Sequence, residues 1–159
     1  MFKFIKEIFL TALLVIFSSS AYGSTPAQII KKNINKYHSL EGYNGEGKAK
    51  VYSQHYHNKK TASGMKFSHY QYTAASVKLP LMSVVRITNK RNGKTIHVLI
   101  NDRGPYKTNA IVDLSKATAA AINYHSSDQV IVEFDIDKTL KLAASKDFNL
   151  FLESLKKTH

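Results

Sequence analysis

The sequence predicts one mainly β domain, on three observations. Runs in the middle of the chain alternate apolar and polar side chains, which is the pattern of strands with one buried face. Asn92-Gly93 lies between two of these runs and supplies the positive φ that a tight antiparallel hairpin needs. The chain has 159 residues, 43% of them hydrophobic, which is enough for one core. Together they predict a closed β-barrel over about residues 47–136.

The strands are expected in four runs. The first follows residue 47, the next two flank the Asn-Gly turn, and the last covers residues 129–136, where the even positions are apolar. The apolar positions that define the first three runs are Ala49, Val51 and Tyr52, then Val84, Val85 and Ile87, then Ile96, Val98 and Ile100.

Two helices are expected beside the strands. Either Asp113 or Ser115 can cap the short Ala-rich run at 116–122. A C-terminal amphipathic helix is expected over residues 137–159, where Phe148, Phe151, Leu152 and Leu155 recur at helical spacing. We interpret its apolar face as docked on the barrel; a basic helix on a membrane surface is the alternative.

The N-terminus has the order of a secretory signal. Lys3 and Lys6 precede an apolar run at 8–17, and small residues follow, up to Gly23. The apolar run is about half of what spans a bilayer. We therefore expect a signal peptide at 1–23, a polar lead-in segment at 24–41 and the barrel domain at 42–136, with an uncleaved anchor as the alternative. The expected location is the periplasm, without a lipid anchor, because the chain has no cysteine.

The chain is strongly basic, with 23 Lys and Arg against 11 Asp and Glu and a formal charge of +12. In an exported protein this charge favours an anionic cell-wall polymer, or acidic lipid, over nucleic acid as a partner. The lack of cysteine excludes disulfides, thiolate zinc sites and a cysteine nucleophile.

The carboxylates are distributed unevenly. Between residues 47 and 127 only Asp102 and Asp113 are acidic, against thirteen Lys and Arg. Asp102 ends an apolar strand just before Gly104-Pro105, so it is expected at a strand-to-loop corner, where catalytic groups often lie. The alternative is that Asp102 only caps that turn. Asp113 is expected to pair with Arg103 or to cap the following helix.

Read in order, several short motifs resemble the rare lipoprotein A (RlpA) family. They are GKAKVY at 47–52, TASG at 61–64, YTAA at 72–75, LP at 79–80, VRITN at 85–89, NG at 92–93, NDRGPY at 101–106 and DLS at 113–115. The resemblance covers the central domain and implies a six-stranded double-psi β-barrel, similar to that of the expansins and of the membrane-bound transglycosylase MltA.

The resemblance also implies an activity, that of an endolytic lytic transglycosylase which cuts peptidoglycan glycan strands and prefers strands without stem peptides. A glycoside hydrolase usually needs two carboxylates. A lytic transglycosylase can work with one, because the 6-hydroxyl of muramic acid attacks its own anomeric carbon and leaves a 1,6-anhydro end. Asp102 is the expected acid/base.

Around Asp102, the expected substrate-binding or site-shaping residues are Arg103, Gly104, Tyr106, Thr61, Ser63 and Ser76, and the expected structural supports are Asp113, Asn101 and Pro105. No cofactor and no metal is expected. The expected partners are glycan strands and, beyond them, envelope or divisome proteins, but not nucleic acid.

This sequence departs from the family at two positions. Met65 stands where the family usually has Glu, and Ser76 where it usually has His. The departures leave open a second function, a barrel that binds peptidoglycan without cutting it. His69 is a conceivable substitute, but we interpret it as an exposed residue near a turn.

Two histidines and four tyrosines could each have either a functional or a purely structural role. His55 and His57 could ligate a metal, yet no carboxylate or cysteine lies near them in sequence, which favours solvent-exposed polar residues. Four tyrosines could stack on sugar rings or could fill the barrel, namely Tyr52, Tyr56, Tyr70 and Tyr72.

Overall fold

The structure is a computed structural model that describes residues 25–147, 150, 151 and 154. The predicted signal peptide lies outside the described residues. So do Phe148, Leu152 and Leu155 of the predicted C-terminal apolar face.

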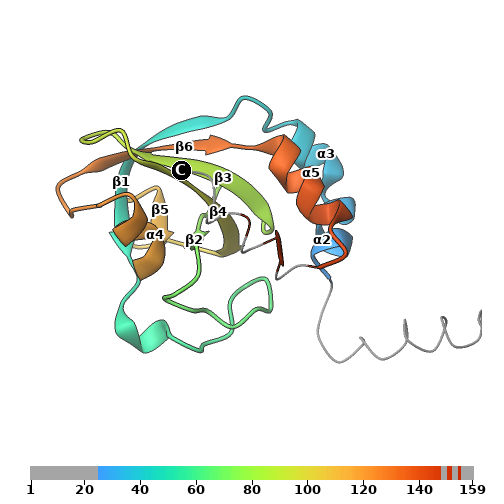
Figure 1. The fold of residues 1–159 in the computed structure, drawn as a ribbon, viewed down its shortest axis with the longest axis horizontal. Coiled ribbons are helices and arrows are strands. Elements are labelled where there is room, and N and C mark those ends of the chain that lie inside the picture. The colour runs from blue at the N-terminus through green and yellow to red at the C-terminus, as the bar shows by residue number, and fades with distance from the viewer. Residues whose placement is uncertain (1–24, 148–149, 152–153, 155–159) are drawn as a thin grey trace, which may run out of the picture.

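Six strands close into a barrel in the order β1-β5-β2-β4-β3-β6 (Figure 1). The elements are α2 (Pro26–Lys32), α3 (Ile34–His38), β1 (Asn44–Val51), the 3-10 turn η2 (Gln54–Tyr56), β2 (Thr73–Ala75), β3 (Ser83–Asn89), β4 (Thr95–Asp102), β5 (Val112–Leu114), α4 (Lys116–Ala121), β6 (Gln129–Phe134) and α5 (Ile136–Ala144). The β1–β5 and β2–β4 pairs are parallel, and the other four are antiparallel. The predicted mainly β barrel with a short Ala-rich helix is confirmed. The helix predicted over residues 137–159 is not continuous, because α5 ends at Ala144 and residues 145–147 are not helical.

The predicted hairpin joins β3 to β4. Gly93 has φ +71°, and its N–H donates to the Asn89 carbonyl at 2.8 Å. The Asn89 N–H donates to the Lys94 carbonyl at 2.9 Å, which closes the turn next to the Thr88–Thr95 register pair. Glycine adopts positive φ without steric cost, so this local sequence is sufficient to set the hairpin register.

The barrel interior is filled by the apolar residues that alternate along β3, β4 and β6. Ile87 lies opposite Ile96, and both are fully buried. Val84 and Leu99, opposite each other on the other face of the β3–β4 pair, are also fully buried. Helix α5 covers part of this face, and its Thr139 Oγ1 accepts from the Val84 N–H at 2.9 Å.

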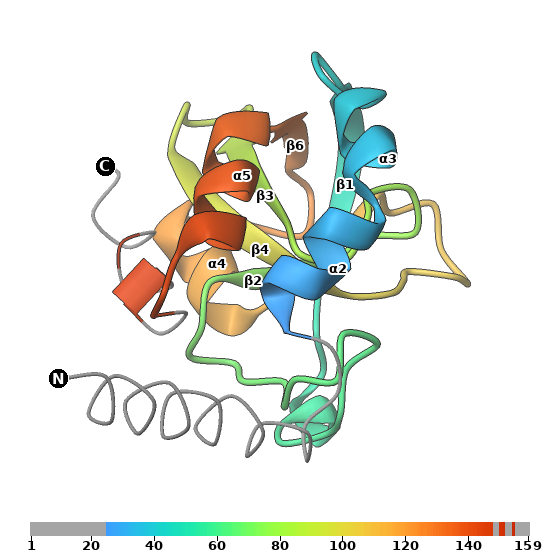
Figure 2. The same ribbon diagram turned by 90° about the vertical axis from the view of Figure 1, so that its right-hand side faces the viewer.

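Helices α2, α3 and α5 lie together on one side of the barrel (Figure 2), and Figure 1 shows α4 on the opposite side. The predicted lead-in segment thus contains two short helices, whose Ile30 and Tyr37 are buried in the main core. Of the predicted C-terminal apolar face, the structure describes Phe151, which packs partly buried against the same core. No described helix has both the length and the apolar character needed to cross a bilayer.

An ion pair between the exposed Arg91 and the buried Asp128 connects the hairpin to the loop before β6. The Asp128 carboxylate accepts from Arg91 Nε, Asn89 Nδ2 and the His125 N–H, each at 2.9 Å. Burial alone would raise the pKa of Asp128, but these three hydrogen bonds outweigh it and lower the pKa to about 2.

We expect this carboxylate to make the fold sensitive to acid. Because the folded pKa is below the ordinary value of about 3.9, its stabilisation is complete above that value and is lost as the pH falls towards 2. Urea unfolding at several pH values between 2 and 6 measures this loss. The Asp128→Asn variant should be less stable at pH 6 and should lose less stability on acidification, whereas Glu41→Gln, at an exposed carboxyl, should follow the wild type. Equal acid sensitivity of Asp128→Asn and wild type would contradict the assignment.

Candidate active site

A β-bulge at the end of β4 sets the direction of Asp102. On β2, the register moves one residue from Ala74 to Ala75, while on β4 it moves two residues, from Ile100 to Asp102. Strict alternation would place Asp102 on the inner face with Ile100, but a bulge re-aims the side chains that follow it. Asp102 is half-buried and lies with Ala75 on the outer face of the barrel.

Four residues form a row across this outer face, which we call the carboxylate row. Asp102 of β4 is the register partner of Ala75 of β2, Ala75 is the partner of Asp113 of β5, and Asp113 is the partner of Lys50 of β1. Register partners on neighbouring strands present their side chains on the same face. The row therefore brings together the two acidic residues of the stretch 47–127 and one lysine.

Asp102 is held by three hydrogen-bond donors. Tyr52 Oη donates to Oδ2 at 2.9 Å, while the Ala62 N–H and the Arg103 N–H donate to Oδ1 at 2.9 and 2.8 Å. Burial, and then the Asp102 carboxylate, raise the pKa of Tyr52, so its hydroxyl keeps the proton that it donates. The Arg103 bond shows that Asp102 does cap its own turn, and the other two fix its position from outside that turn.

The segment between β1 and β2 brings Tyr52 and Ala62 to the carboxylate. Tyr52 packs on Phe67 with ring centroids 4.3 Å apart, and the two rings form a second small core with Ala75. This core lies on the outer face of the barrel, at the centre of the carboxylate row. It anchors a long loop whose tip would otherwise be free to move.

Asp113 has a different environment. Burial, and then the negative charge of Asp102, raise the pKa of Asp113, against an opposing effect of Lys50. Gly104, with φ +133°, passes close by: a Cβ there would meet Asp113 Oδ2 at 3.4 Å, so the chain approaches the carboxylate closely.

The prediction that Asp113 pairs with Arg103 or caps helix α4 is wrong. The α4 cap is Ser115, whose Oγ accepts from the Thr118 N–H at 3.1 Å. Arg103 Nη1 donates to the carbonyls of Ser76 and Leu79 at 3.0 and 2.7 Å. Within the described residues the Asp113 carboxylate has no hydrogen bond, because its potential partner is committed to backbone carbonyls.

Ser76 lies beside the Asp102 backbone but is turned away from the carboxylate. Its N–H donates to the Asp102 carbonyl at 3.2 Å, and its Oγ accepts from the Leu79 N–H at 3.2 Å. It is 2% exposed, so a histidine side chain does not fit there without repacking.

The turn at residues 61–65 is fixed on β4 by backbone contacts. The Ser63 N–H donates to the carbonyl of the buried Asn101 at 3.1 Å, and the Thr61 Oγ1 donates to the Met65 carbonyl at 3.0 Å. Met65 itself packs, half-buried, against the main core. The turn aims the Ala62 N–H at Asp102, and its side chains line a pocket of ≈ 480 Å³ that helix α2 closes on the other side.

The loop after Asp102 leads away from the row. Pro105 is half-buried and Tyr106 is 72% exposed, and within the described residues no hydrogen bond or ring contact joins Tyr106 to either carboxylate. Tyr106 is thus available at the surface, while Gly104 is the member of this loop that contacts the row.

His69 is buried, and its interpretation as an exposed residue is wrong. It is 2% exposed and packs edge-on against Phe67 at 4.9 Å and stacks with His57 at 5.7 Å. Burial lowers the pKa of His69, with a smaller effect from Lys116. The chain of ring contacts from Asp102 runs through Tyr52 and Phe67 before it reaches His69, so His69 does not stand in for the missing histidine. In the described part of the chain no three metal-ligating side chains meet.

The sequence of this chain is similar to those of several known proteins. A family model described as "Lytic transglycolase" matches residues 45–134. The chain is 34% identical over 116 residues to an endolytic peptidoglycan transglycosylase RlpA of Neisseria meningitidis serogroup A, covering 71% of this chain and 48% of that protein. It is 36% identical over 126 residues to the RlpA of Rickettsia felis (76% and 54%) and 37% identical over 101 residues to that of Pseudomonas aeruginosa UCBPP-PA14 (64% and 30%).

The chain spans about half the length, or less, of these relatives. The family match lies within the six strands, from the start of β1 to the end of β6. The chain belongs to the lytic transglycolase family of double-psi β-barrels, to which its RlpA relatives also belong.

Proposed function

We propose that this protein is a lytic transglycosylase that cuts the glycan strands of peptidoglycan within the strand and leaves 1,6-anhydro-muramic ends. The observation that carries the proposal is the carboxylate row, in which Asp102 and Asp113 lie on the same outer face of the barrel in different environments. The names of the RlpA relatives support the same reaction and the same polymer.

In the proposed reaction the glycosidic oxygen gains one proton, the 6-hydroxyl group loses one proton, and no water is consumed. The proton of Asp113 in its neutral form passes to the glycosidic oxygen as the bond of that oxygen to C1 of muramic acid breaks. Positive charge then develops on the sugar ring and is stabilised by the ionised carboxylate. Asp102 takes the proton of the 6-hydroxyl of the same sugar, whose oxygen bonds to C1.

The two carboxyls are suited to share this work. Asp102 accepts three hydrogen bonds, whereas Asp113 accepts none within the described residues, is desolvated and has a raised pKa. Two titratable groups whose environments differ in this way commonly divide acid and base roles. Asp113, whose raised pKa makes it easier to protonate, is the proposed donor of the first proton, and Asp102 is the proposed acceptor of the 6-hydroxyl proton.

The substitutions at Met65 and Ser76 favour a second function, glycan binding without cleavage. Neither side chain can transfer a proton in the way that a carboxylate or an imidazole does. With no acidic side chain at position 65, the acidic group that the 61–65 turn contacts within the described residues is Asp102, through the Ala62 N–H. Cleavage without Glu at 65 and His at 76 therefore depends on Asp102 and Asp113 alone.

The proposed substrate is a strand without stem peptides, and the proposed location is the periplasm. Incubation of purified stripped strands with the protein, followed by mass spectrometry, tests the function. Shortened strands with 1,6-anhydro ends support it, while strands that are bound but uncut support the binding function instead.

We expect Tyr52→Phe to lower the cleavage rate about tenfold. A hydrogen bond to a charged group contributes about 1.5–3 kcal/mol, and the lower end suits the half-buried Asp102 and corresponds to about a tenfold change in rate. The phenyl ring keeps the packing on Phe67. Tyr56→Phe is the matched control, because Tyr56 packs edge-on against Tyr52 at 5.5 Å and is 45% exposed. Equal rates for the two variants in a strand-release assay would contradict this role of Tyr52.

A further inference from the structure

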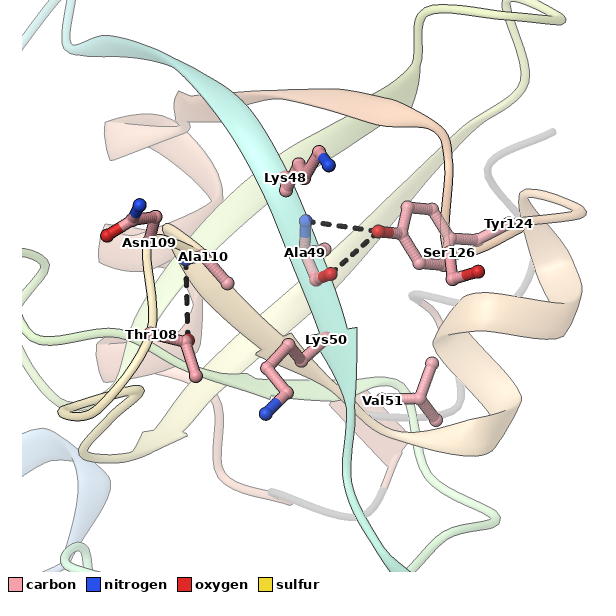
Figure 3. Close-up of a pocket in the computed structure, with 9 residues that line it drawn as sticks. All are labelled: Lys48, Ala49, Lys50, Val51, Thr108, Asn109, Ala110, Tyr124 and Ser126. Atoms are coloured by element: carbon pink, nitrogen blue, oxygen red, sulfur yellow. Dashed lines mark hydrogen bonds between the residues drawn. The ribbon is translucent and has the colours of Figure 1, made fainter.

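A second pocket, of ≈ 470 Å³, lies over strand β1 (Figure 3). Its volume is within the range of about 300–1,000 Å³ that is usual for small-molecule sites. Residues 108–110 form one side, Tyr124 and Ser126 form the other, and residues 48–51 form the floor between them. Tyr124 is fixed in place, because its hydroxyl donates to the Ala49 carbonyl at 2.6 Å and accepts from the Ala49 N–H at 3.2 Å.

The floor carries two exposed lysines, Lys48 and Lys50, which alternate with the buried Ala49 and so share the outer face of β1. Within the described residues neither ammonium group forms a hydrogen bond or an ion pair. The nearest acid along the strand, Glu46, is paired with Lys90. The pocket therefore carries two ammonium groups that no direct ion pair occupies in the described part of the chain, and Asp113 is the carboxylate that lies opposite Lys50.

The pocket adjoins the proposed reaction site. Lys50 is the register partner of Asp113 and lies close enough to influence its pKa. The loop that forms one wall, residues 108–110, connects Asp102 and Gly104 to the strand of Asp113. A glycan bound beside Asp113 would thus extend into this pocket at the Lys50 end of the row.

We propose that the pocket over β1 binds the free lactyl carboxylate of a muramic acid residue next to the bond that is cut. This proposal rests on the proposed function, since it names what the same site recognises. Lys48 and Lys50 supply the charge, the Thr108, Asn109 and Ser126 side chains offer hydrogen bonds to sugar hydroxyl and acetamido groups, and Tyr124 supplies a rigid wall. The two lysine Cα atoms are about 6.6 Å apart along the strand, and both side chains line the same pocket (Figure 3).

The chemistry of the ligand explains a preference for stripped strands. When a stem peptide is attached, the lactyl carboxyl becomes a neutral amide, and the nearest carboxylates lie further out on the peptide. When the peptide is removed, a short, charged substituent remains on each muramic acid. A pocket with two lysines next to the row then distinguishes the two states through charge.

The test compares Lys48→Gln, Lys50→Gln and the double variant with Lys141→Gln, which removes one exposed charge from helix α5 on another side of the barrel. The probes are a stripped GlcNAc–MurNAc tetrasaccharide, the same tetrasaccharide with stem peptides, and chitotetraose, which has no carboxylate. Calorimetry gives the Kd of each pair, and the thermal midpoint of each variant confirms that it is folded.

We expect each pocket variant to weaken binding of the stripped tetrasaccharide about fivefold, with chitotetraose and the Lys141→Gln variant unaffected. The proposal would be overturned if the pocket variants lost as much affinity for chitotetraose as for the stripped tetrasaccharide. An unchanged Kd in the double variant, or no binding of the stripped tetrasaccharide by the wild type, would also overturn it. Equal loss for strands with stem peptides would overturn the lactyl group as the ligand and point to peptide carboxylates.

Cleavage, measured separately, distinguishes this proposal from the function on which it rests. If the wild type yields anhydro ends while the pocket variants bind every probe as the wild type does, the pocket proposal fails and the function stands. If the lysines control binding but the wild type yields no anhydro ends, the pocket proposal stands and the transglycosylase function fails.

Discussion

Asp102→Asn is expected to reduce the formation of anhydro-ended product by about 10²–10⁴-fold, the usual range for a general acid or base. Asparagine has nearly the same shape as aspartate and keeps an oxygen for the Ala62 and Arg103 N–H groups, but it cannot accept the 6-hydroxyl proton. Binding of stripped strands should persist. The measurement is product formation by mass spectrometry, together with Kd and the thermal midpoint.

The matched control is Asp137→Asn, at an exposed position in the first turn of helix α5. It makes the same chemical change away from the carboxylate row and should leave the rate unchanged. If Asp102→Asn unfolds the barrel, the capping role of Asp102 is its main one. If it folds and cuts strands at the wild-type rate, Asp102 has no part in proton transfer.

Asp113→Asn is expected to lower the rate about 10²-fold and, at neutral pH, to raise the stability of the fold. Burial raises the pKa of Asp113 above its ordinary value, so the group favours the folded state fully below the unfolded pKa of about 3.9. That contribution is lost as the pH rises through the folded pKa. At neutral pH the charged, half-buried carboxylate is thus unfavourable, and the neutral amide removes this cost.

Two measurements test the role of Asp113. The pH–rate profile of the wild type should fall on its alkaline side as Asp113 loses its proton, and urea unfolding at pH 7 should show Asp113→Asn to be more stable than the wild type. A variant that is less stable and as active as the wild type would make Asp113 a structural support, as the sequence suggests. A stabler variant with a much lower rate indicates a residue retained for function.

The parts of this fold that follow from local sequence were predictable. The hairpin depends on Asn92-Gly93, and the inward-facing positions of β3, β4 and β6 follow from alternation, so both were correctly predicted. Strands β2 and β5 have only three residues each, too few for a periodic pattern to be recognised. They are positioned by pairing with distant strands, which no local signal encodes.

The sequence was sufficient to identify Asp102 as a candidate site residue, but not to identify the residues that surround it. The position of Asp102 before Gly104-Pro105 marked it, but its outward direction comes from a bulge, whereas alternation places it inside with Ile100. Its donors Tyr52 and the Ala62 N–H come from 50 and 40 residues away. In the sequence Lys50 is one of many basic residues, and only the β1–β5 register shows that it lies opposite Asp113.

The environments of His69 and Ser76 likewise depend on tertiary packing. Polar residues near turns are usually exposed, yet both are 2% exposed because the loop between β1 and β2 and the loop before β3 fold back on the barrel. The burial of Ser76 also explains why this chain cannot acquire the family histidine by one substitution without repacking its neighbours.

Cleavage of stripped glycan strands in water enriched in heavy oxygen tests the central claim most directly. Intramolecular attack by the 6-hydroxyl consumes no water, so the new muramic ends should be lighter by one water than hydrolytic ends and should carry no heavy oxygen. New ends that are reducing and labelled with heavy oxygen would show hydrolysis and contradict the account. Strands that stay intact with wild-type protein that binds them would also contradict it, in favour of a barrel that only recognises the glycan.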